Sequence, residues 1–288
     1  MNLLKAAQTA IQHPGMPEAY SHYLLHRSLG MRGPYIRVGS GARIGRTWVN
    51  FSEYWSYRGS GHFPGPSISP AIMSLISSSQ MQADGKSIAV DAGANIGVFT
   101  AAFAAAGFTD IHAFEPVPAT FARLTENVAF NHFGSRTHLN PMGLGDHECV
   151  LNMRYDRKSP ATAHVTGETM HDSCPVQITT LDRYAELNEI HHVDFLKIDT
   201  EGYETAVLRG GTSLLREKRV ALILLEWCPE LLVRAGSSAD ELWHTINGLG
   251  YVFHPISLKP RMDEPVTLDE LKSSPWTNLI AVPAKDAM

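Results

Sequence analysis

The sequence has few cysteines, no long apolar run and no basic cluster, and each shortage excludes a class of protein. The three cysteines, Cys149, Cys174 and Cys228, form no CxxC pair, which argues against a zinc or dithiol redox site and favours reduced, structural thiols. The longest run of large apolar residues, 220–225, has six positions, against the roughly twenty that cross a bilayer. The amino terminus lacks the apolar core and cleavage site of a signal peptide. We therefore expect a soluble, cytoplasmic protein with no membrane partner.

The charges are few and unevenly placed along the chain. The formal net charge is −5, and no basic stripe interleaved with aromatic residues is present, so we expect no nucleic-acid partner. Residues 1–80 carry seven basic and two acidic side chains, a net charge of +5, which leaves −10 for residues 81–288. A stretch rich in proline and glycine at residues 60–70 is typical of a hinge. These features predict a small N-terminal cap, residues 1–80, and a main domain, residues 81–288.

From residue 87 onward, short apolar runs alternate with amphipathic stretches. Strands that alternate with helices of about ten or more residues indicate βαβ units and a doubly wound α/β sheet. Two further strand-like segments are joined by the polar stretch 156–173, which we predict to be a mobile loop or hairpin at the sheet edge. The six principal strands are predicted at residues 87–91, 111–115, 193–199, 220–226, 251–256 and 277–282.

The loop after the first predicted strand reads Asp91-Ala-Gly93-Ala-Asn95-Ile-Gly97, and in open α/β sheets ligands bind at that end of the strands. Gly93 permits a tight turn and a close backbone approach to a ligand, and Gly97 lets a helix and a strand pack closely. The GxGxxG spacing that admits a pyrophosphate is absent, and Asp91 would repel one. Glu115 ends the second strand, where an acid can accept both hydroxyls of a ribose. Together these residues predict a nucleoside with a positive 5′ side, S-adenosylmethionine.

Six stretches of the chain resemble the FkbM-type S-adenosylmethionine-dependent methyltransferases. The resemblance spans about residues 87–227 and does not reach the first eighty residues. The stretches are VDAGANIGVFT at 90–100, AFEPVPATFARLTENVAFN at 113–131, GLGD at 143–146, ITTLDRY at 178–184, DFLKIDTEGYETAVLRGG at 194–211 and ILLEW at 223–227.

This resemblance implies a class I, Rossmann-like fold with a mostly parallel seven-stranded sheet of order 3-2-1-4-5-7-6, in which strand 7 is antiparallel. It implies that the loop at 91–97 holds the methionine side of the cofactor and that Glu115 holds the ribose. Leu144 and Asp146 would lie near the adenine, and Asp199 would close the pocket. The usual reaction is O-methylation of a hydroxyl on a sugar or a secondary metabolite. The candidate cofactor-binding residues are Asp91, Gly93, Asn95, Gly97, Thr100, Glu115, Pro116, Leu144, Asp146 and Asp199.

An alcohol is a poor nucleophile while it is protonated, so such a reaction is expected to need a base or a metal. Asp199, Glu201, Glu204 and Glu226 lie at or just beyond the ends of two neighbouring predicted strands. In an extended chain Asp199 and Glu201 would point to the same side, and such oxygen ligands could hold Mg²⁺. The simpler alternatives are that Glu204 favours a helix N-terminus and that Glu226 pairs with an arginine. We therefore assign no residue as a metal ligand.

Histidine is the other residue type that could serve as the base. His254 lies in a late strand, and His164 and His171 lie in the polar stretch, but each could equally be an ordinary solvent-facing or hydrogen-bonded histidine. The candidate catalytic residues are Asp199, Glu201, Glu226 and His254.

The leading hypothesis is an O-methyltransferase that acts on a hydroxyl of a small molecule, such as a sugar, a glycolipid or a secondary metabolite of polyketide or peptide type. An NAD-dependent oxidoreductase or epimerase is disfavoured, because both GxGxxG and a Tyr-x-x-x-Lys pair are missing. A noncatalytic partner protein with a methyltransferase fold is a third alternative. The acceptor and the oligomeric state stay open, with a homodimer among the alternatives.

Overall fold

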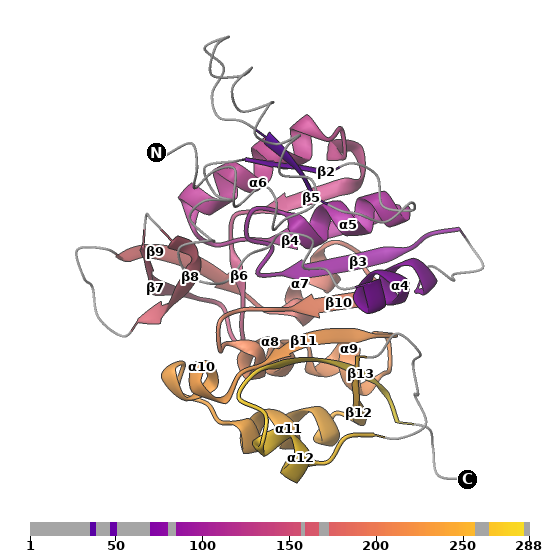
Figure 1. Cartoon of the computed structure of the whole chain (residues 1–288), viewed down its shortest axis with the longest axis vertical. Helices are drawn as coiled ribbons and strands as arrows, with labels where there is room; N and C mark the ends of the chain where they lie inside the picture. The colour runs from indigo at the N-terminus through magenta and orange to yellow at the C-terminus, as the bar shows by residue number, and fades with distance from the viewer. Residues whose placement is uncertain are drawn as a thin grey trace, which may run out of the picture.

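A seven-stranded sheet lies at the centre of the molecule (Figure 1). The computed structural model describes residues 35–38, 47–50, 70–79, 85–156, 159–166, 173–256 and 265–284. The strand order is β5-β4-β3-β10-β11-β13-β12, in which β13 is antiparallel to both neighbours and the other pairs are parallel. This is the order 3-2-1-4-5-7-6, so the predicted class I fold is confirmed. The strands are β3 (Ile88–Ala92), β4 (Asp110–Phe114), β5 (Thr137–Asn140), β10 (Phe195–Ile198), β11 (Ile223–Trp227), β12 (Tyr251–Pro255) and β13 (Thr277–Pro283).

Helices cover both faces of this sheet. Because successive side chains of a strand point to opposite faces, Ala89 packs with α4 and α5, whereas Val90 packs with the layer on the other side. The first layer consists of α4 (Pro70–Ser78), α5 (Val98–Ala106) and α6 (Pro118–Phe130). The second consists of α7 (Leu181–Leu187), α8 (Glu204–Gly210), α9 (Thr212–Arg216) and α11 (Ala239–Gly248), with α10 (Pro229–Arg234) and α12 (Leu268–Lys272) beside it.

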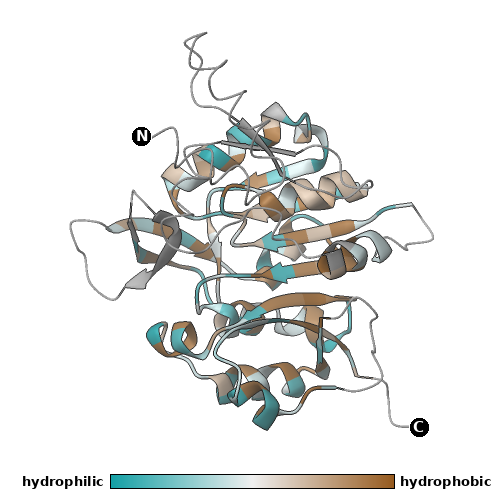
Figure 2. Cartoon of the chain, viewed as in Figure 1, coloured by the Kyte–Doolittle hydropathy of each residue, from teal (hydrophilic) through white to brown (hydrophobic). Residues whose placement is uncertain are grey.

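The hydropathy of the strands agrees with this arrangement, since the central strands are predominantly apolar (Figure 2). A strand that is covered on both faces reads as a nearly continuous apolar run, and β11 with its buried Ile223, Leu224 and Leu225 is an example. Within the part of the chain that the structure describes, no helix combines the length and the apolar character needed to cross a membrane.

A second sheet of four strands lies beside the end of the first (Figure 1). Its order is β6-β9-β7-β8, and β7 pairs antiparallel with both of its neighbours. Of the two alternatives predicted for 156–173, a mobile loop or a hairpin, the structure shows the hairpin, because residues 159–166 form a strand that pairs antiparallel with β7. Residues 157–158 and 167–172 lie outside the described residues. The three cysteines are free, as expected. The strands are β6 (Gly143–Leu144), β7 (Cys149–Asp156), β8 (Ser159–Thr166) and β9 (Ser173–Thr179).

Among residues 1–69 the structure describes two short strands. β1 (Tyr35–Val38) and β2 (Thr47–Asn50) pair antiparallel in a separate sheet, and β2 runs near the backbone of α5 and α6. The proposed hinge at residues 60–70 lies outside the described residues except for Pro70, which begins α4. The division into a cap and a main domain stays a prediction.

Candidate cofactor and acceptor site

The loop between β3 and α5 is fixed by the ends of two neighbouring strands. The amides of Gly93 and Ala94 donate to the carbonyl of Phe114 at the end of β4, at 3.1 and 2.8 Å. Gly93 has a φ of 75°, and a Cβ there would lie 2.0 Å from the carbonyl oxygen of Asp199. The structure thus shows a close approach of Gly93 to the chain after β10, whereas the predicted approach to a ligand stays a prediction. Only glycine satisfies both the left-handed backbone and this contact.

The other end of the loop is fixed in a similar way. Gly97 has a φ of 92°, and a Cβ there would lie 2.7 Å from Cδ1 of Leu124 in α6. The close packing predicted for Gly97 thus joins the start of α5 to α6, a helix, and not to a strand. Asn95 adopts a φ of 52°, a left-handed conformation that is costly for a residue with a side chain. The strained backbone lies at the centre of the predicted cofactor loop.

Glu115 connects the loops that follow β3 and β4. Its Oε2 accepts a hydrogen bond from the amide of Asn95 at 3.0 Å, and its Oε1 accepts one from the amide of Val117 at 2.9 Å. Burial raises the pKa of Glu115 to about 7 in spite of these two bonds. Each carboxylate oxygen can accept a further hydrogen bond, so the side chain retains acceptor capacity for hydroxyl groups.

A buried ion pair lies beneath the loop. Asp91 is fully buried, and its Oδ2 accepts a hydrogen bond from Thr100 at 2.6 Å. Nζ of Lys197 lies 3.2 Å from Oδ1 of Asp91 and donates to the carbonyl oxygen of Gly93 at 2.7 Å. The negative charge of Asp91 is therefore matched inside the protein, and Asp91 does not offer an open carboxylate to a ligand.

Lys197 also contacts Asp199 at the end of β10. Nζ lies 3.5 Å from Oδ2 of Asp199, whose side chain is 43% exposed. Burial lowers the pKa of Lys197, but the charges of Asp199 and Asp91 outweigh it, so the pKa is raised on balance. Sequence reasoning missed Lys197. Its position within a predicted apolar strand could have indicated a buried ion pair, since a charged residue is almost never buried without a partner.

Three carboxyl groups lie at the ends of β10 and β11: Asp199 and Glu201 follow β10, and Glu226 is the penultimate residue of β11. Burial raises the pKa of Glu201 to about 8, and the charges of Asp199 and Glu226 add to the effect. Burial also raises the pKa of Glu226 to about 7, again with a contribution from Asp199. The indole N–H of Trp276, which precedes β13, donates to Oε1 of Glu226. These near-neutral pKa values are suited to proton transfer.

The shape of this segment differs from the expected one. β10 ends at Ile198, and Glu201 has a φ of 55°, so the extended geometry that would put Asp199 and Glu201 on one side is wrong. Among the described residues, these carboxylates do not bring three ligand atoms within 4.8 Å of one another. The arrangement gives no support to the suggested Mg²⁺ site.

Glu204 holds the turn between β10 and α8. Its buried Oε1 accepts hydrogen bonds from the amide of Thr200 at 2.9 Å, the hydroxyl of Thr200 at 3.0 Å and the amide of Gly202 at 3.2 Å. Glu204 is the first residue of α8, so the alternative in which it serves a helix N-terminus describes its position best. Sequence spacing alone does not separate this carboxylate from the others.

The remaining candidates divide into two groups. The first group is Leu144, Pro116 and Asp146. Leu144 is buried on β6, and a Cβ on the adjacent Gly143 would lie 3.6 Å from Pro116. Asp146 follows β6, and its Oδ1 lies 2.6 Å from Nδ1 of His147. These residues lie next to the end of β4, as expected for one side of a cofactor site. His254 is buried on β12, and β13 separates it from β11 and Glu226.

Comparisons with known proteins give a consistent result. The model of the FkbM methyltransferase domain matches residues 91–253, more than half of the chain. "Methyltransferase 1" of Beauveria bassiana is 30% identical over 145 residues, which are 43% of this chain and 58% of that protein. The hexuronic acid methyltransferase AglP of Haloferax volcanii is 30% identical over 134 residues, 46% of this chain and 53% of that protein. The chain thus spans little more than half the length of each relative.

Solved structures show similar chains at lower sequence identity. An S-adenosylmethionine-dependent O-methyltransferase of Thermotoga maritima is 12% identical, with a TM-score of 0.41 over 76% of this chain and 67% of that chain. An rRNA methylase of Streptococcus thermophilus is also 12% identical, with a TM-score of 0.41 over 74% of this chain and 94% of that chain.

The buried ion pair predicts a large effect of removing its cation. We expect Lys197→Met to lower the free energy of unfolding by about 3–5 kcal/mol, because Asp91 would stay buried without its partner. Urea denaturation measures the loss. Lys272→Met, which removes the cation of an exposed pair with Asp240, is the matched control and should change stability little. Equal losses in the two variants would contradict the importance of the buried pair.

The raised pKa of Glu201 predicts how stability depends on pH. A carboxyl group whose pKa is higher in the folded state binds its proton more tightly there, so its stabilising contribution is complete below about pH 4.5 and is lost as pH rises to about 8. We expect the Tm to fall between about pH 4.5 and pH 8, and Glu201→Gln to reduce that fall by roughly 2–4 °C for each kcal/mol regained. Glu217→Gln, at an exposed site, should leave the slope unchanged, and an unchanged slope in Glu201→Gln would refute the assignment.

Proposed function

The chain belongs to the FkbM methyltransferase family, and from that premise we propose that it transfers the methyl group of S-adenosylmethionine to a hydroxyl of a small molecule. The observation that carries the proposal is the position of Glu201 and Glu226. These carboxyl groups, with pKa values of about 8 and 7, lie just after β10 and at the penultimate position of β11, next to the strand ends that hold the cofactor loop. Family membership favours methyl transfer over the NAD-dependent alternative.

The donor set of the loop fits this cofactor. Asp199 offers a partly exposed carboxylate for the ammonium group, and Glu115 has acceptor capacity for the ribose hydroxyls. Leu144, Pro116 and Asp146 would border the adenine, while Asp91 and Thr100 hold the loop from below through Lys197 and α5. The bound cofactor would supply a methyl group that is activated by the positive sulfur.

The protein's own contribution to the reaction would be orientation and proton transfer. A hydroxyl must lose its proton as it attacks the methyl carbon, and a general base is most effective when its pKa lies near the working pH. Glu226, with a pKa of about 7, is our first choice as the base, and Asp199 raises the pKa values of both Glu226 and Glu201. Trp276 donates to Glu226 and fixes its orientation. His254 remains a weaker alternative, because β13 separates it from β11.

The chemistry of this edge favours a neutral hydroxylated acceptor. Trp276 is a 52% exposed aromatic side chain beside Glu226, and its ring offers an apolar surface for the face of a sugar or similar ring. The relative from Haloferax volcanii is named as a hexuronic acid methyltransferase, which supports a sugar acceptor. The carboxylate of Asp199, and that of Glu226 once it has lost its proton, would repel an acidic sugar, so we propose an uncharged one.

The first test is cofactor binding. We expect S-adenosylmethionine and S-adenosylhomocysteine to bind the full chain in a calorimetric titration, and Asp199→Asn to weaken S-adenosylmethionine by about tenfold to a hundredfold, because a charged hydrogen bond is lost. Asp240→Asn, an exposed acid on α11, is the control and should bind as the wild type does. Failure of both compounds to bind the wild type would contradict the proposed function.

The second test concerns the base. With methyl-labelled S-adenosylmethionine and a panel of neutral glycosides and alcohols, we expect the rate to rise with pH through about 7, because Glu226 must lose its proton to act. Glu226→Gln should lower kcat by about 10²–10⁴ and leave cofactor affinity nearly unchanged. A wild-type rate in Glu226→Gln would place the base elsewhere. Cofactor binding without transfer to any acceptor, in extracts as well as in the panel, would favour the noncatalytic alternative.

A further inference from the structure

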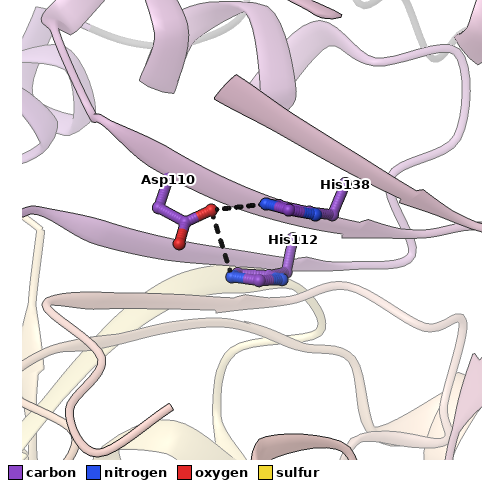
Figure 3. Close-up of side chains that lie close together, drawn as sticks. All are labelled: Asp110, His112 and His138. Carbon is purple, nitrogen blue, oxygen red and sulfur yellow. Dashed lines mark ion pairs between the residues drawn. The ribbon is translucent and has the colours of Figure 1, made fainter. Parts of the chain in front are cut away.

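Two histidines and an aspartate meet at the opposite end of β4 from Glu115 (Figure 3). Asp110 is the first residue of β4, His112 lies two positions further on, and His138 on β5 is the register partner of His112. Alternate residues of a strand point to the same face, and register partners share a face. The parallel pairing of two strands therefore places all three side chains together.

The potential ligand atoms converge. Oδ1 of Asp110 lies 2.8 Å from Nε2 of His138 and 3.4 Å from Nε2 of His112. The three atoms lie within 4.8 Å of one another. The two imidazole rings are stacked, with centroids 4.6 Å apart and planes at 9°, and both rings direct Nε2 towards Asp110 (Figure 3).

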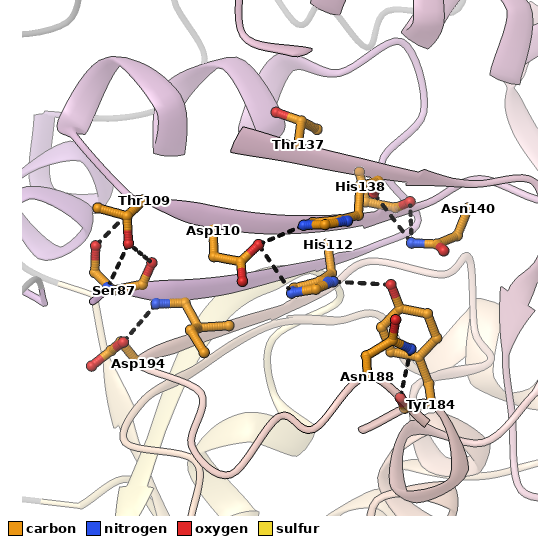
Figure 4. Close-up of polar contacts among 12 residues, drawn as sticks. Ser87, Thr109, Asp110, His112, Thr137, His138, Asn140, Tyr184, Asn188 and Asp194 are labelled. Carbon is orange, nitrogen blue, oxygen red and sulfur yellow. Dashed lines mark hydrogen bonds and ion pairs between the residues drawn. The ribbon is translucent and has the colours of Figure 1, made fainter. Parts of the chain in front are cut away.

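His112 is oriented from behind by a tyrosine. Its Nδ1 lies 2.9 Å from the hydroxyl of Tyr184 on α7 (Figure 4). The tautomer that donates Nδ1–H to Tyr184 leaves the lone pair of Nε2 directed at the cluster. The His112 side chain is 3% exposed, and its buried Nε2 has no hydrogen-bond partner in the described part of the protein. A ligating histidine commonly has such a partner for its other ring nitrogen.

The chemistry of the three side chains suits a metal cation. Each neutral imidazole offers the lone pair of one ring nitrogen, and a carboxylate offers oxygen acceptors. Nε2 of His112, Nε2 of His138 and Oδ1 of Asp110 are the atoms that meet in the cluster.

We propose that Asp110, His112 and His138 bind a divalent transition-metal ion of the Zn²⁺ type, with water in the remaining position. Two imidazoles and a carboxylate are a common donor set for this ion, with bonds of about 2.0–2.2 Å. The metal must lie in the plane of each ring, so one ring must turn out of the stack. His138 can do so because its side chain is 57% exposed, whereas His112 is held by Tyr184.

A metal at this site would stabilise the edge of the sheet and would take no part in methyl transfer. β5 is the edge strand of the seven-stranded sheet, and its described pairing is with β4. A metal held by Asp110 and His112 from β4 and by His138 from β5 would link the two strands. The cluster lies at the start of β4, whereas Glu115 follows the end of that strand. Metal binding to the cluster should therefore leave the affinity for the cofactor unchanged.

The test is a titration of the chelator-treated full chain with Zn²⁺ by calorimetry and with Co²⁺ by visible absorption. We expect a site with a stoichiometry of one that His138→Ala and Asp110→Asn weaken by about a hundredfold or more, and that Tyr184→Phe weakens by about tenfold to a hundredfold. His191→Ala, at another exposed histidine, is the matched control and should retain the site. An unchanged affinity in Tyr184→Phe would overturn the role of that residue.

A second readout follows from linkage, because a ligand that binds only the folded state raises its stability. At about a hundredfold excess of Zn²⁺ over Kd, we expect the Tm of the wild type to rise by roughly 5–10 °C and that of His138→Ala to stay unchanged. Because His138 is exposed, this variant should fold, and its wild-type affinity for S-adenosylmethionine would confirm that it does. The proposal is overturned if the wild type binds neither metal, or if His138→Ala binds them as tightly as the wild type.

Discussion

The rest of the site depends on the buried cation of Lys197. Its Nζ contacts Asp91 on β3, the carbonyl of Gly93 in the loop and Asp199 after β10, so a single charge joins two segments, 91–93 and 197–199, that are far apart in the sequence. Neither Asp91 nor Lys197 could stay buried alone, because an uncompensated charge in the interior is strongly destabilising. The pair therefore fixes β3 against β10, and the hydrogen bond from Lys197 to the carbonyl of Gly93 ties the loop to the pair, which helps to maintain the backbone strain at Asn95.

The same lysine cannot neutralise every acid at this edge of the sheet. Glu201 and Glu226 lie beyond Asp91 and Asp199, and burial raises their pKa values into the range where a proton can be exchanged near neutral pH, with a further contribution from the charge of Asp199. Asp199 therefore joins the two halves of the proposed reaction. Its carboxylate favours a cofactor that carries an ammonium and a sulfonium over one that carries phosphates, and its charge raises the pKa of the proposed base, Glu226. One carboxylate thus serves both binding and proton transfer.

Much of the fold could be predicted because apolar runs, such as the one that becomes β11, mark buried strands directly. For β8 the sequence left a loop and a hairpin open, because its proline, alanine, threonine and histidine do not mark a strand, and only the pairing with β7 decides for the hairpin. In the candidate site, the sequence predicts which residues lie at the ends of strands, but it does not predict which residues they contact. Sequence does not reveal that Gly93 packs on Asp199, or that Glu204 bonds the turn that puts Glu201 in a left-handed conformation. Such details depend on contacts between segments.

β4 carries polar groups at both ends with different degrees of constraint. Glu115 accepts two backbone amides, so its position is tied to the loops around it. At the other end, His112 is held by Tyr184, while His138 on the edge strand is largely exposed and can turn. The buried Ile111, Ala113 and Phe114 pack against helices on the two faces between these ends. Because a close-packed segment resists deformation, a local change in the histidine cluster can stabilise the sheet edge without moving Glu115. The two ends can therefore serve independent purposes on one strand.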